Sequence, residues 1–206
     1  MPYAFCPAFM KMKELLLQPR LQLLADMVPA GSRLADVGTD HGYVPVWLMQ
    51  RGRIAAAIAS DIGAEPLRHA KETAAEYKVS GIDFRLCAGL DAIGPEEVET
   101  ILIAGMGGET IQTILSDAPW TADGGYLLLL QPMTKVELLR KWLSDNQYHF
   151  TEERLVCDKN HLYPVFAVRG GAGTPITLVQ QYGGVMLDGD PLYAAYLEER
   201  IAKLYK

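Results

Sequence analysis

Short apolar segments alternate with amphipathic segments along the chain as far as Asn146. The apolar segments have the length of strands and end in glycine, glutamine, cysteine or an acidic residue: RLADVG, AAAIASD, IDFRLC, ETILIAG and GYLLLLQ. The segments between them carry apolar residues three and four positions apart, as helices do: VPVWLMQR, EPLRHAKETAAEYK, GETIQTILSDA and KVELLRKWLSDN. Strict alternation of this kind predicts a parallel sheet wrapped by helices on both faces.

The rhythm changes after Asn146. The segments YHFTEERLVCD and YPVFAVRG follow each other with no helix between them, which predicts a hairpin at one edge of the sheet. The expected fold is therefore α/β: a Rossmann-like, doubly wound, mostly parallel seven-stranded sheet with an edge hairpin and a short C-terminal helix. Residues 10–28 predict a leading helix that restarts at Pro19, because proline is tolerated in a first turn.

The chain divides into one main domain and a C-terminal segment. We expect the main domain over residues 1–170, with residues 1–10 as a loose tail. Residues 171–206 are expected to be a linker and a helical appendage, since the glycine-rich stretch up to Gly189 predicts a loop and PLYAAYLEERIAKLYK predicts a helix. One face of that helix needs an apolar partner, because its apolar residues recur at helical spacing: Tyr193, Tyr196, Leu197, Ile201 and Leu204.

Composition excludes several classes of protein. The cysteines, Cys6, Cys87 and Cys157, are odd in number and far apart, which argues against a disulfide framework or a zinc knuckle and fits a cytoplasmic location. No metal-ligand pattern is visible. The apolar run GYLLLLQP is far too short to cross a bilayer. The net charge of -6 argues against a protein that coats nucleic acid, so any RNA contact requires a local basic patch.

The stretch LADVGTDHGY, residues 34–43, has the character of a ligand-binding turn. Gly38 and Gly42 flank Asp40, and glycines let a backbone pass close to a ligand, but the spacing is not that of a dinucleotide fingerprint. Asp61 ends the next apolar run, where a carboxylate can accept both hydroxyls of a ribose. Either feature alone is equally compatible with a structural turn or a helix cap, whereas their order and spacing favour a nucleoside ligand.

Two further segments follow later strands of the predicted sheet. CAGLDAI, residues 87–93, offers Leu90 as a surface against which a ring could pack. IAGMGGET, residues 103–110, leaves backbone groups bare at Gly105, Gly107 and Gly108, although a tight strand-to-helix turn would look the same. Ligands of doubly wound folds collect at the carboxyl ends of the strands, so these elements are expected to face one cleft.

Taken in order, RLADVGTDHGYVP, IAGMGG, LLLLQP and ELLRKWLSDN resemble the bacterial tRNA (adenine-22-N1)-methyltransferase family. The resemblance runs from about Lys11 to about Gly170 and continues faintly to the last helix. It implies a class I methyltransferase domain over residues 1–170, S-adenosyl-L-methionine as cofactor, tRNA as partner, and no membrane or metal. We expect a monomer or a weak dimer.

The resemblance also implies a set of site residues. Around the cofactor it places Asp36, Gly38, Asp40, His41, Gly42 and Tyr43 at the methionine end, Asp61 and Ile62 at the ribose, Ala88, Gly89 and Leu90 at the adenine, and Gly105, Met106 and Gly107 at the reaction centre. The residues expected to border the substrate are Arg20, Gln131, Pro132, Asn160 and Tyr163. Arg20 is equally compatible with a lid helix that only covers the core.

Three departures from the family pattern are visible. Ala88 stands where the family has an acidic or amide residue, Pro164 replaces an acid, and the C-terminal helical hairpin is represented only by its first helix, a truncated appendage. These departures keep two alternatives open. One is a methyltransferase that acts on a small molecule, and the other is a nucleoside-binding module without catalysis.

The expected chemistry needs little from the protein beyond alignment and electrostatics. N1 of adenine has a free lone pair at neutral pH, so it can attack a sulfonium methyl group without deprotonation. Asp40 is the candidate catalytic carboxylate for the purine that becomes cationic, and Tyr43 is a candidate stacking surface or donor. His41 could be a base, but a histidine beside a helix start more often packs or caps. Candidate phosphate contacts are Lys11, Lys13, Arg20, Lys135, Arg140 and Lys159.

Overall fold

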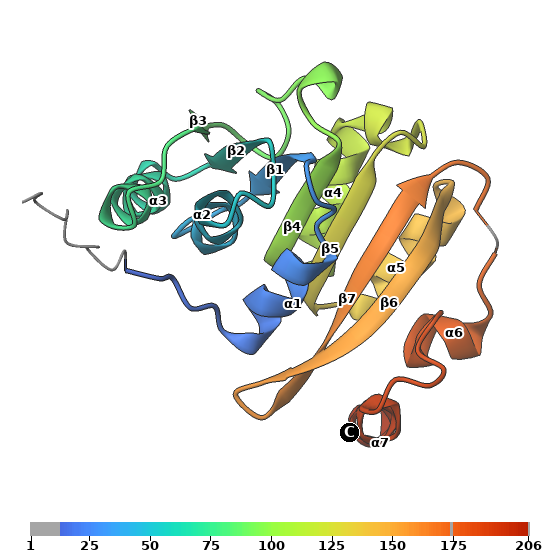
Figure 1. Ribbon diagram of the computed structural model, residues 1–206. Coiled ribbons are helices and arrows are strands. Elements are labelled where there is room, and N and C mark those ends of the chain that lie inside the picture. The colour runs from blue at the N-terminus through green and yellow to red at the C-terminus, as the bar shows by residue number, and fades with distance from the viewer. Residues whose placement is uncertain (1–12, 174, 206) are drawn as a thin grey trace, which may run out of the picture.

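A seven-stranded sheet forms the centre of the computed structural model, which describes residues 13–173 and 175–205 (Figure 1). The strands lie in the order β3-β2-β1-β4-β5-β7-β6. Their bounds are β1 (Arg33–Val37), β2 (Ala56–Asp61), β3 (Ile82–Leu86), β4 (Thr100–Gly107), β5 (Leu127–Thr134), β6 (Tyr148–Asp158) and β7 (His161–Gly170). β1 to β5 are parallel, and β7 runs antiparallel to β5 and β6. The expected fold class, including the edge hairpin, is confirmed.

Helices cover both faces of this sheet. Their bounds are α1 (Pro19–Met27), α2 (Tyr43–Gln50), α3 (Ala64–Glu76), α4 (Gly108–Asp117), α5 (Val136–Asp145), α6 (Leu178–Gly183) and α7 (Tyr193–Leu204), with 3-10 turns at 95–97 and 119–122. Leu34 packs with α1 and α2 in one buried cluster, whereas Ala35 packs with α4 and α5 in the other, because successive strand residues face opposite sides. None of the described helices combines the length and apolar character that crossing a bilayer requires.

The leading helix is shorter than expected. α1 begins at Pro19, and residues 13–18 are not helical, while residues 10–12 of the expected helix lie outside the described residues. The reason is steric: a proline ring disfavours the helical conformation of the residue before it, and Gln18 is extended, with φ −66° and ψ 155°. Pro19 therefore starts the helix instead of restarting one.

The C-terminal segment contains more structure than its glycines indicated. α6 lies inside the stretch expected to be a loop, and its start is a capping box in which Thr177 Oγ1 accepts from the Gln180 amide at 3.2 Å. α7 packs against the sheet domain through Tyr196, which is buried with Leu155 and Leu187. The expected apolar face therefore has a partner at Tyr196, while Ile201 on the same helix is exposed.

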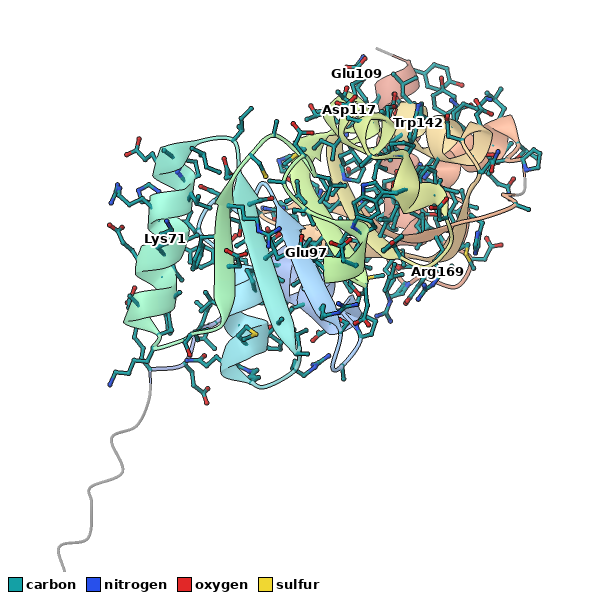
Figure 2. All side chains as sticks on the ribbon, turned by 90° about the horizontal axis from the view of Figure 1, so that it is seen from above. Lys71, Glu97, Glu109, Asp117, Trp142 and Arg169 are labelled. Carbon is teal, nitrogen blue, oxygen red and sulfur yellow. The ribbon has the colours of Figure 1, made fainter. Side chains whose placement is uncertain are left out.

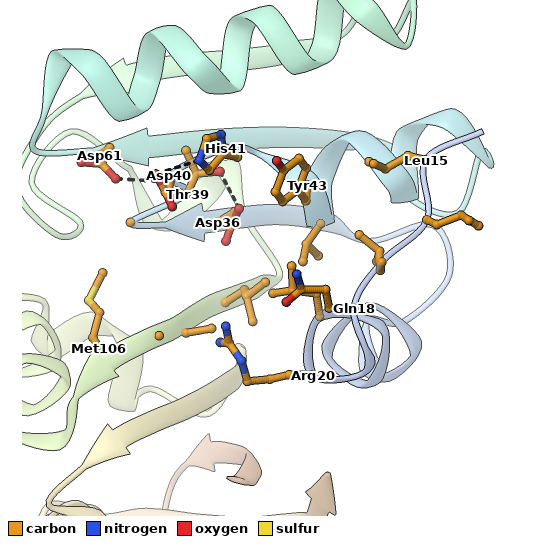
Figure 3. Close-up of a pocket in the computed structure, with 18 of the residues that line it drawn as sticks. Leu15, Gln18, Arg20, Asp36, Thr39, Asp40, His41, Tyr43, Asp61 and Met106 are labelled. Atoms are coloured by element: carbon orange, nitrogen blue, oxygen red, sulfur yellow. Dashed lines mark hydrogen bonds and ion pairs between the residues drawn. The ribbon is translucent and has the colours of Figure 1, made fainter. Parts of the chain in front are cut away.

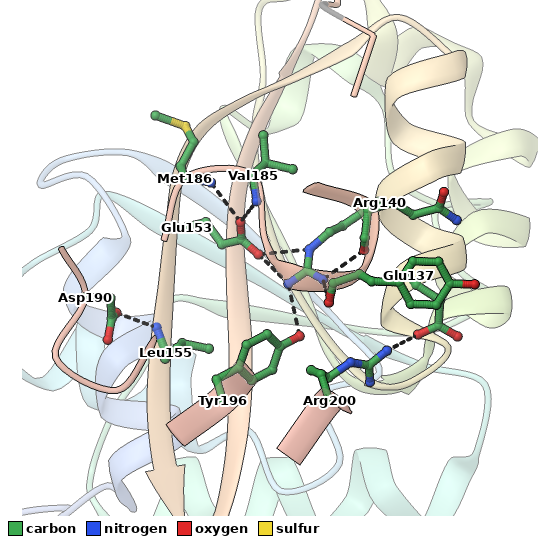
Figure 4. A network of polar contacts seen from close by, with 11 residues as sticks. Glu137, Arg140, Glu153, Leu155, Val185, Met186, Asp190, Tyr196 and Arg200 are labelled. Carbon is green, nitrogen blue, oxygen red and sulfur yellow. Dashed lines mark hydrogen bonds and ion pairs between the residues drawn. The ribbon is translucent and has the colours of Figure 1, made fainter. Parts of the chain in front are cut away.

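A buried ion pair fastens the C-terminal segment to the sheet domain (Figure 4). Arg140 of α5 and Glu153 of β6 have fully buried side chains, and Arg140 Nη2 lies 2.6 Å from Glu153 Oε1. Arg140 also donates to the Gln181 carbonyl and the Tyr196 hydroxyl, both at 3.1 Å. The other carboxylate oxygen of Glu153 accepts the Val185 amide at 2.6 Å. Arg140 is therefore not the phosphate contact that the sequence suggested, since no solvent reaches its guanidinium.

Loss of this pair should loosen the fold far more than loss of a surface pair. Arg140→Met leaves the Glu153 carboxylate buried without its cation, which typically costs about 3–5 kcal/mol. The matched control is Lys141→Met, because the neighbouring Lys141 makes an exposed ion pair with Asp145, and such pairs contribute at most about 1 kcal/mol. Urea denaturation of both variants measures the difference. Equal losses of unfolding free energy would contradict a structural role for the buried pair.

Candidate cofactor and substrate site

The turn after β1 is fastened to the end of β2 by backbone hydrogen bonds. The Ser60 carbonyl accepts from the amides of Gly38 at 2.8 Å and Thr39 at 2.9 Å. Gly38 has φ +72° and Asp40 has φ +50°, a conformation that glycine adopts freely and aspartate tolerates. The Asp40 amide points to Asp61 Oδ2 at 3.4 Å. Asp40, in the turn after β1, and Asp61, at the end of β2, are thus neighbours.

Asp36, the fourth residue of β1, carries a buried carboxylate beneath this turn. Thr39 Oγ1 donates to Asp36 Oδ2 at 2.6 Å. Burial raises the pKa of Asp36 to about 6, with a smaller contribution in the same direction from Asp61, while the Thr39 hydrogen bond opposes the rise. The charge of Asp36 is therefore costly in the free protein, and a cationic ligand group beside it would compensate the charge.

Two cavities meet at the carboxyl ends of β1, β2 and β4. The larger, of about 660 Å³, is drawn in Figure 3 and has walls from α1, the turn after β1 and the start of α2. The smaller, of about 500 Å³, lies between the loop after β3 and α4, whose Glu109 and Asp117 line it (Figure 2). Gly38, Asp61 and Met106 line both cavities. A ligand that extends over these three residues would reach into both cavities.

Met106 stands at the junction of the cavities. A Cβ built on Gly38 would lie 2.0 Å from Met106 Cε, so the methionine methyl rests directly against the glycine. The pairing of β4 with β5 is irregular on both sides of Met106. Gly38 therefore does more than shape the turn, because its missing side chain is the space that the Met106 tip occupies.

Arg20, which lines the larger cavity, is the centre of a polar cluster. Arg20 Nη1 donates to Gln131 Oε1 at 2.6 Å, and the same oxygen accepts the Gly105 amide at 3.2 Å. Arg20 Nε lies 3.7 Å from Asp158, and the guanidinium lies over the Tyr163 ring at 5.8 Å. Arg20 thus contacts two other residues expected to border the substrate, Gln131 and Tyr163.

Most of the expected cofactor residues line these cavities. The larger is lined by Asp36, Gly38, Asp40, His41, Tyr43, Asp61, Gly105 and Met106, and the smaller by Gly38, Asp61, Ile62, Ala88, Gly89, Leu90 and Met106. Gly42 and Gly107 line neither. A Cβ on Gly42 would lie 3.0 Å from the Ala70 Cβ, so this glycine admits α3 close to the turn.

The remaining expected substrate residues are more dispersed. Pro132 and Tyr163 line a third cavity, of about 480 Å³, between the end of β5, β7 and α7. Asn160 lies in the turn between β6 and β7, with φ +61°, and lines none of these three cavities. Lys13, expected as a phosphate contact, pairs with Glu76. Lys11 lies outside the described residues.

His69 contacts an expected site residue, a position that the sequence did not reveal. Its ring on α3 stacks on the His41 ring, at 5.0 Å between centroids. Asp40, His41 and His69 also bring donor atoms within 4.8 Å of one another, a combination seen in metal sites. The two imidazole rings, however, lie in nearly parallel planes, at 8°. An ion cannot lie in both planes, so coordination would require one ring to leave the stack.

Comparisons with known proteins show the family of this chain. Residues 17–166 match the family described as a methyltransferase domain. The tRNA (adenine(22)-N(1))-methyltransferase of Bacillus subtilis is 32% identical over 90% of this chain and 76% of its own.

Two solved structures are similar over most of both chains. Streptococcus pneumoniae Sp1610 in complex with S-adenosyl-L-methionine has TM-score 0.82 and 31% identity, covering 90% and 88% of the two chains. M. capricolum TrmK in complex with S-adenosyl-homocysteine has TM-score 0.79 and 26% identity, covering 92% and 85%. The chain therefore belongs to the tRNA (adenine-22-N1)-methyltransferase family.

Proposed function

We propose that this protein transfers a methyl group from S-adenosyl-L-methionine to N1 of an adenine in tRNA, adenine 22 by its family. The observation that carries the proposal is the pair of cavities that share Gly38, Asp61 and Met106. One extended nucleoside cofactor fits across that junction, and the larger cavity leaves room for a nucleobase. Family membership favours tRNA over the small-molecule substrate and over the module without catalysis.

The residues at the junction suit each part of the cofactor. The smaller cavity offers a purine an apolar lining that includes Leu90 and Ile114. Asp61 can accept the ribose hydroxyls with the lone pairs that its hydrogen bond from the Gly63 amide, at 2.8 Å, leaves free. Asp36 lines the larger cavity, where its carboxylate would hold the cofactor ammonium group.

The chain's own task in the reaction is to align groups and to stabilise charge. The bound cofactor supplies a sulfonium methyl group; the N1 lone pair forms the new bond, the sulfur keeps the electrons of the broken one, and the positive charge passes to the purine. No residue has to remove a proton from N1 before attack. Asp40, at the rim of the larger cavity, would place negative charge near the purine, and Tyr43 would offer a ring face.

Arg20, with Gln131 and Tyr163, would border the tRNA substrate. The target base has to leave its stack to reach a cavity of this kind, as base-modifying enzymes generally require. Gln131 Oε1 joins Arg20 to the Gly105 amide, so the helix α1 and the end of β4 are held in register at the point where the base would enter.

Incubation with tRNA and S-adenosyl-L-methionine should yield 1-methyladenosine, identified by mass spectrometry of the digested tRNA. A transcript in which adenine 22 is replaced by guanine is the control and should stay unmethylated. Methylation of a different nucleoside would overturn the base assignment, and equal methylation of both transcripts would overturn the position.

Asp40→Asn should lower the single-turnover methylation rate by about 10- to 100-fold and leave cofactor affinity nearly unchanged. Loss of one preorganised electrostatic contact typically lowers the rate by about 100-fold. Asp40 is exposed in the free protein, where solvent screens its charge, so a loss nearer to about 10-fold is also expected. Asp123→Asn, at an exposed position before β5 that lines neither cavity, is the control. If cofactor affinity falls and the saturated rate holds, Asp40 instead orients the cofactor.

Asp36→Asn should raise the unfolding free energy of the free protein at pH 8 by about 1–3 kcal/mol and leave it nearly unchanged at pH 4. With a folded pKa of about 6 against an ordinary value of 3.8, the folded state binds more protons between these pH values. Wild-type stability therefore falls as pH rises through that window. Thermal denaturation across pH, with the exposed Asp26→Asn as control, measures the effect, and a variant that is destabilised at pH 8 would contradict it.

A further inference from the structure

Three aromatic rings from two separate parts of the chain form a continuous stack beside the larger cavity. His41 lies parallel to Tyr43, at 5.2 Å between centroids and 9° between planes, and parallel to His69, at 5.0 Å and 8°. These separations are typical of offset-stacked rings. Because His41 makes both contacts, it is the middle ring, and Tyr43 and His69 are the ends.

The close approach of α3 to the turn assembles this stack. Gly42 follows His41, and its missing side chain lets Ala70 come near, since a Cβ there would lie 3.0 Å from the Ala70 Cβ. His69, one residue before Ala70, then covers the His41 ring. Arg68, the preceding residue of α3, contacts the same ring, with its Nη2 3.1 Å from His69 Nε2.

The Tyr43 end of the stack reaches the larger cavity. Tyr43 and His41 line that cavity, whereas His69 does not, and Figure 3 shows the two lining rings beside each other near Asp36. Tyr43 is 38% exposed, and among the described residues the ring contacts of Tyr43 end with His41. The stack is thus ordered from α3 toward the space that the proposed function gives to the target base.

We infer that Tyr43, His41 and His69 form a platform on which the flipped adenine stacks as the fourth ring, and that His69 is its positioning residue. The inference rests on the proposed function and assigns the substrate side of that site. Stacking on an aromatic face is a general means of holding an unpaired base. A tyrosine face also attracts positive charge, so the contact strengthens as the purine becomes cationic. His69 acts through His41 by fixing the Tyr43 ring before the base arrives.

Steady-state kinetics with tRNA test the platform. Tyr43→Ala should lower kcat/KM for tRNA by about 10-fold or more, the effect expected when a stacked base loses its platform. His69→Ala should lower kcat/KM for tRNA by about 3- to 10-fold, the contribution of one aromatic pair, with calorimetric affinity for S-adenosyl-L-methionine unchanged. His69→Phe should recover most of that loss, because it keeps a ring without a nitrogen. Ala75→Gln, at an exposed position of the same helix, is the control for changes at the α3 surface.

Several results would overturn the inference. Wild-type kinetics of His69→Ala would show that the stack positions nothing. A loss of cofactor affinity in that variant would assign His41 to the cofactor instead of the base. Equal impairment of His69→Phe and His69→Ala, together with inhibition by a chelator, would point to the nitrogens and a metal ion. Thermal denaturation of every variant establishes that the fold is intact.

A binding measurement separates this inference from the proposed function. 2-Aminopurine at position 22 of the tRNA should fluoresce less when bound to the wild-type protein than when bound to Tyr43→Ala, because both proteins take the base out of its stack in the tRNA but only the wild-type protein stacks it on an aromatic ring. Absence of 1-methyladenosine with wild-type protein counts against the proposed function, whereas equal fluorescence with the two proteins counts against the platform.

Discussion

Two amide hydrogen bonds to one carbonyl set the geometry on which the site depends. By accepting from Gly38 and Thr39, Ser60 fastens the turn after β1 to the end of β2. The strands on either side are in register, with Val37 opposite Ser60, so Asp61 emerges beside the turn instead of one step away from it. Gly38 and Asp61, two of the three residues that line both cavities, therefore take their positions from this local arrangement of the backbone.

Two groups of buried charged side chains in this protein differ in how their charges are compensated. Near the junction, Asp36 is buried with a raised pKa, a cost that a cationic ligand group would remove. Far from it, Arg140 and Glu153 are buried but mutually satisfied, and they hold α6 and α7 against β6. The first group is arranged at the expense of stability in the free protein, as binding sites often are, whereas the second fixes the fold.

The alternation of apolar and amphipathic segments was sufficient to predict the sheet, its parallel order and the edge hairpin, because these follow from local periodicity. The turn DVGTDHGY and Asp61 could also be placed together, since strand ends meet at one edge of such a sheet. The start of α1 at Pro19, the helix α6 and the burial of Arg140 were missed or misjudged. Each depends on sterics, capping or a partner outside the local segment. The segment KVELLRKWLSDN alone does not indicate that Arg140 pairs with Glu153. His69 was missed for the same reason, because only the packing of α3 on Gly42 brings it to His41.

The contact between Met106 and Gly38 has a consequence for how ligand fragments would add together. In the proposed site, adenosine alone would occupy the smaller cavity and methionine alone the larger one, each with Met106 left in place against the glycine. The joined cofactor would pass over Gly38 and would have to turn the Met106 side chain away. Joining two fragments ordinarily gains affinity by sparing one of them its loss of rotational and translational freedom. In this site part of that gain would go into moving the flexible Met106 thioether, so the whole cofactor would bind less tightly than its separate halves imply.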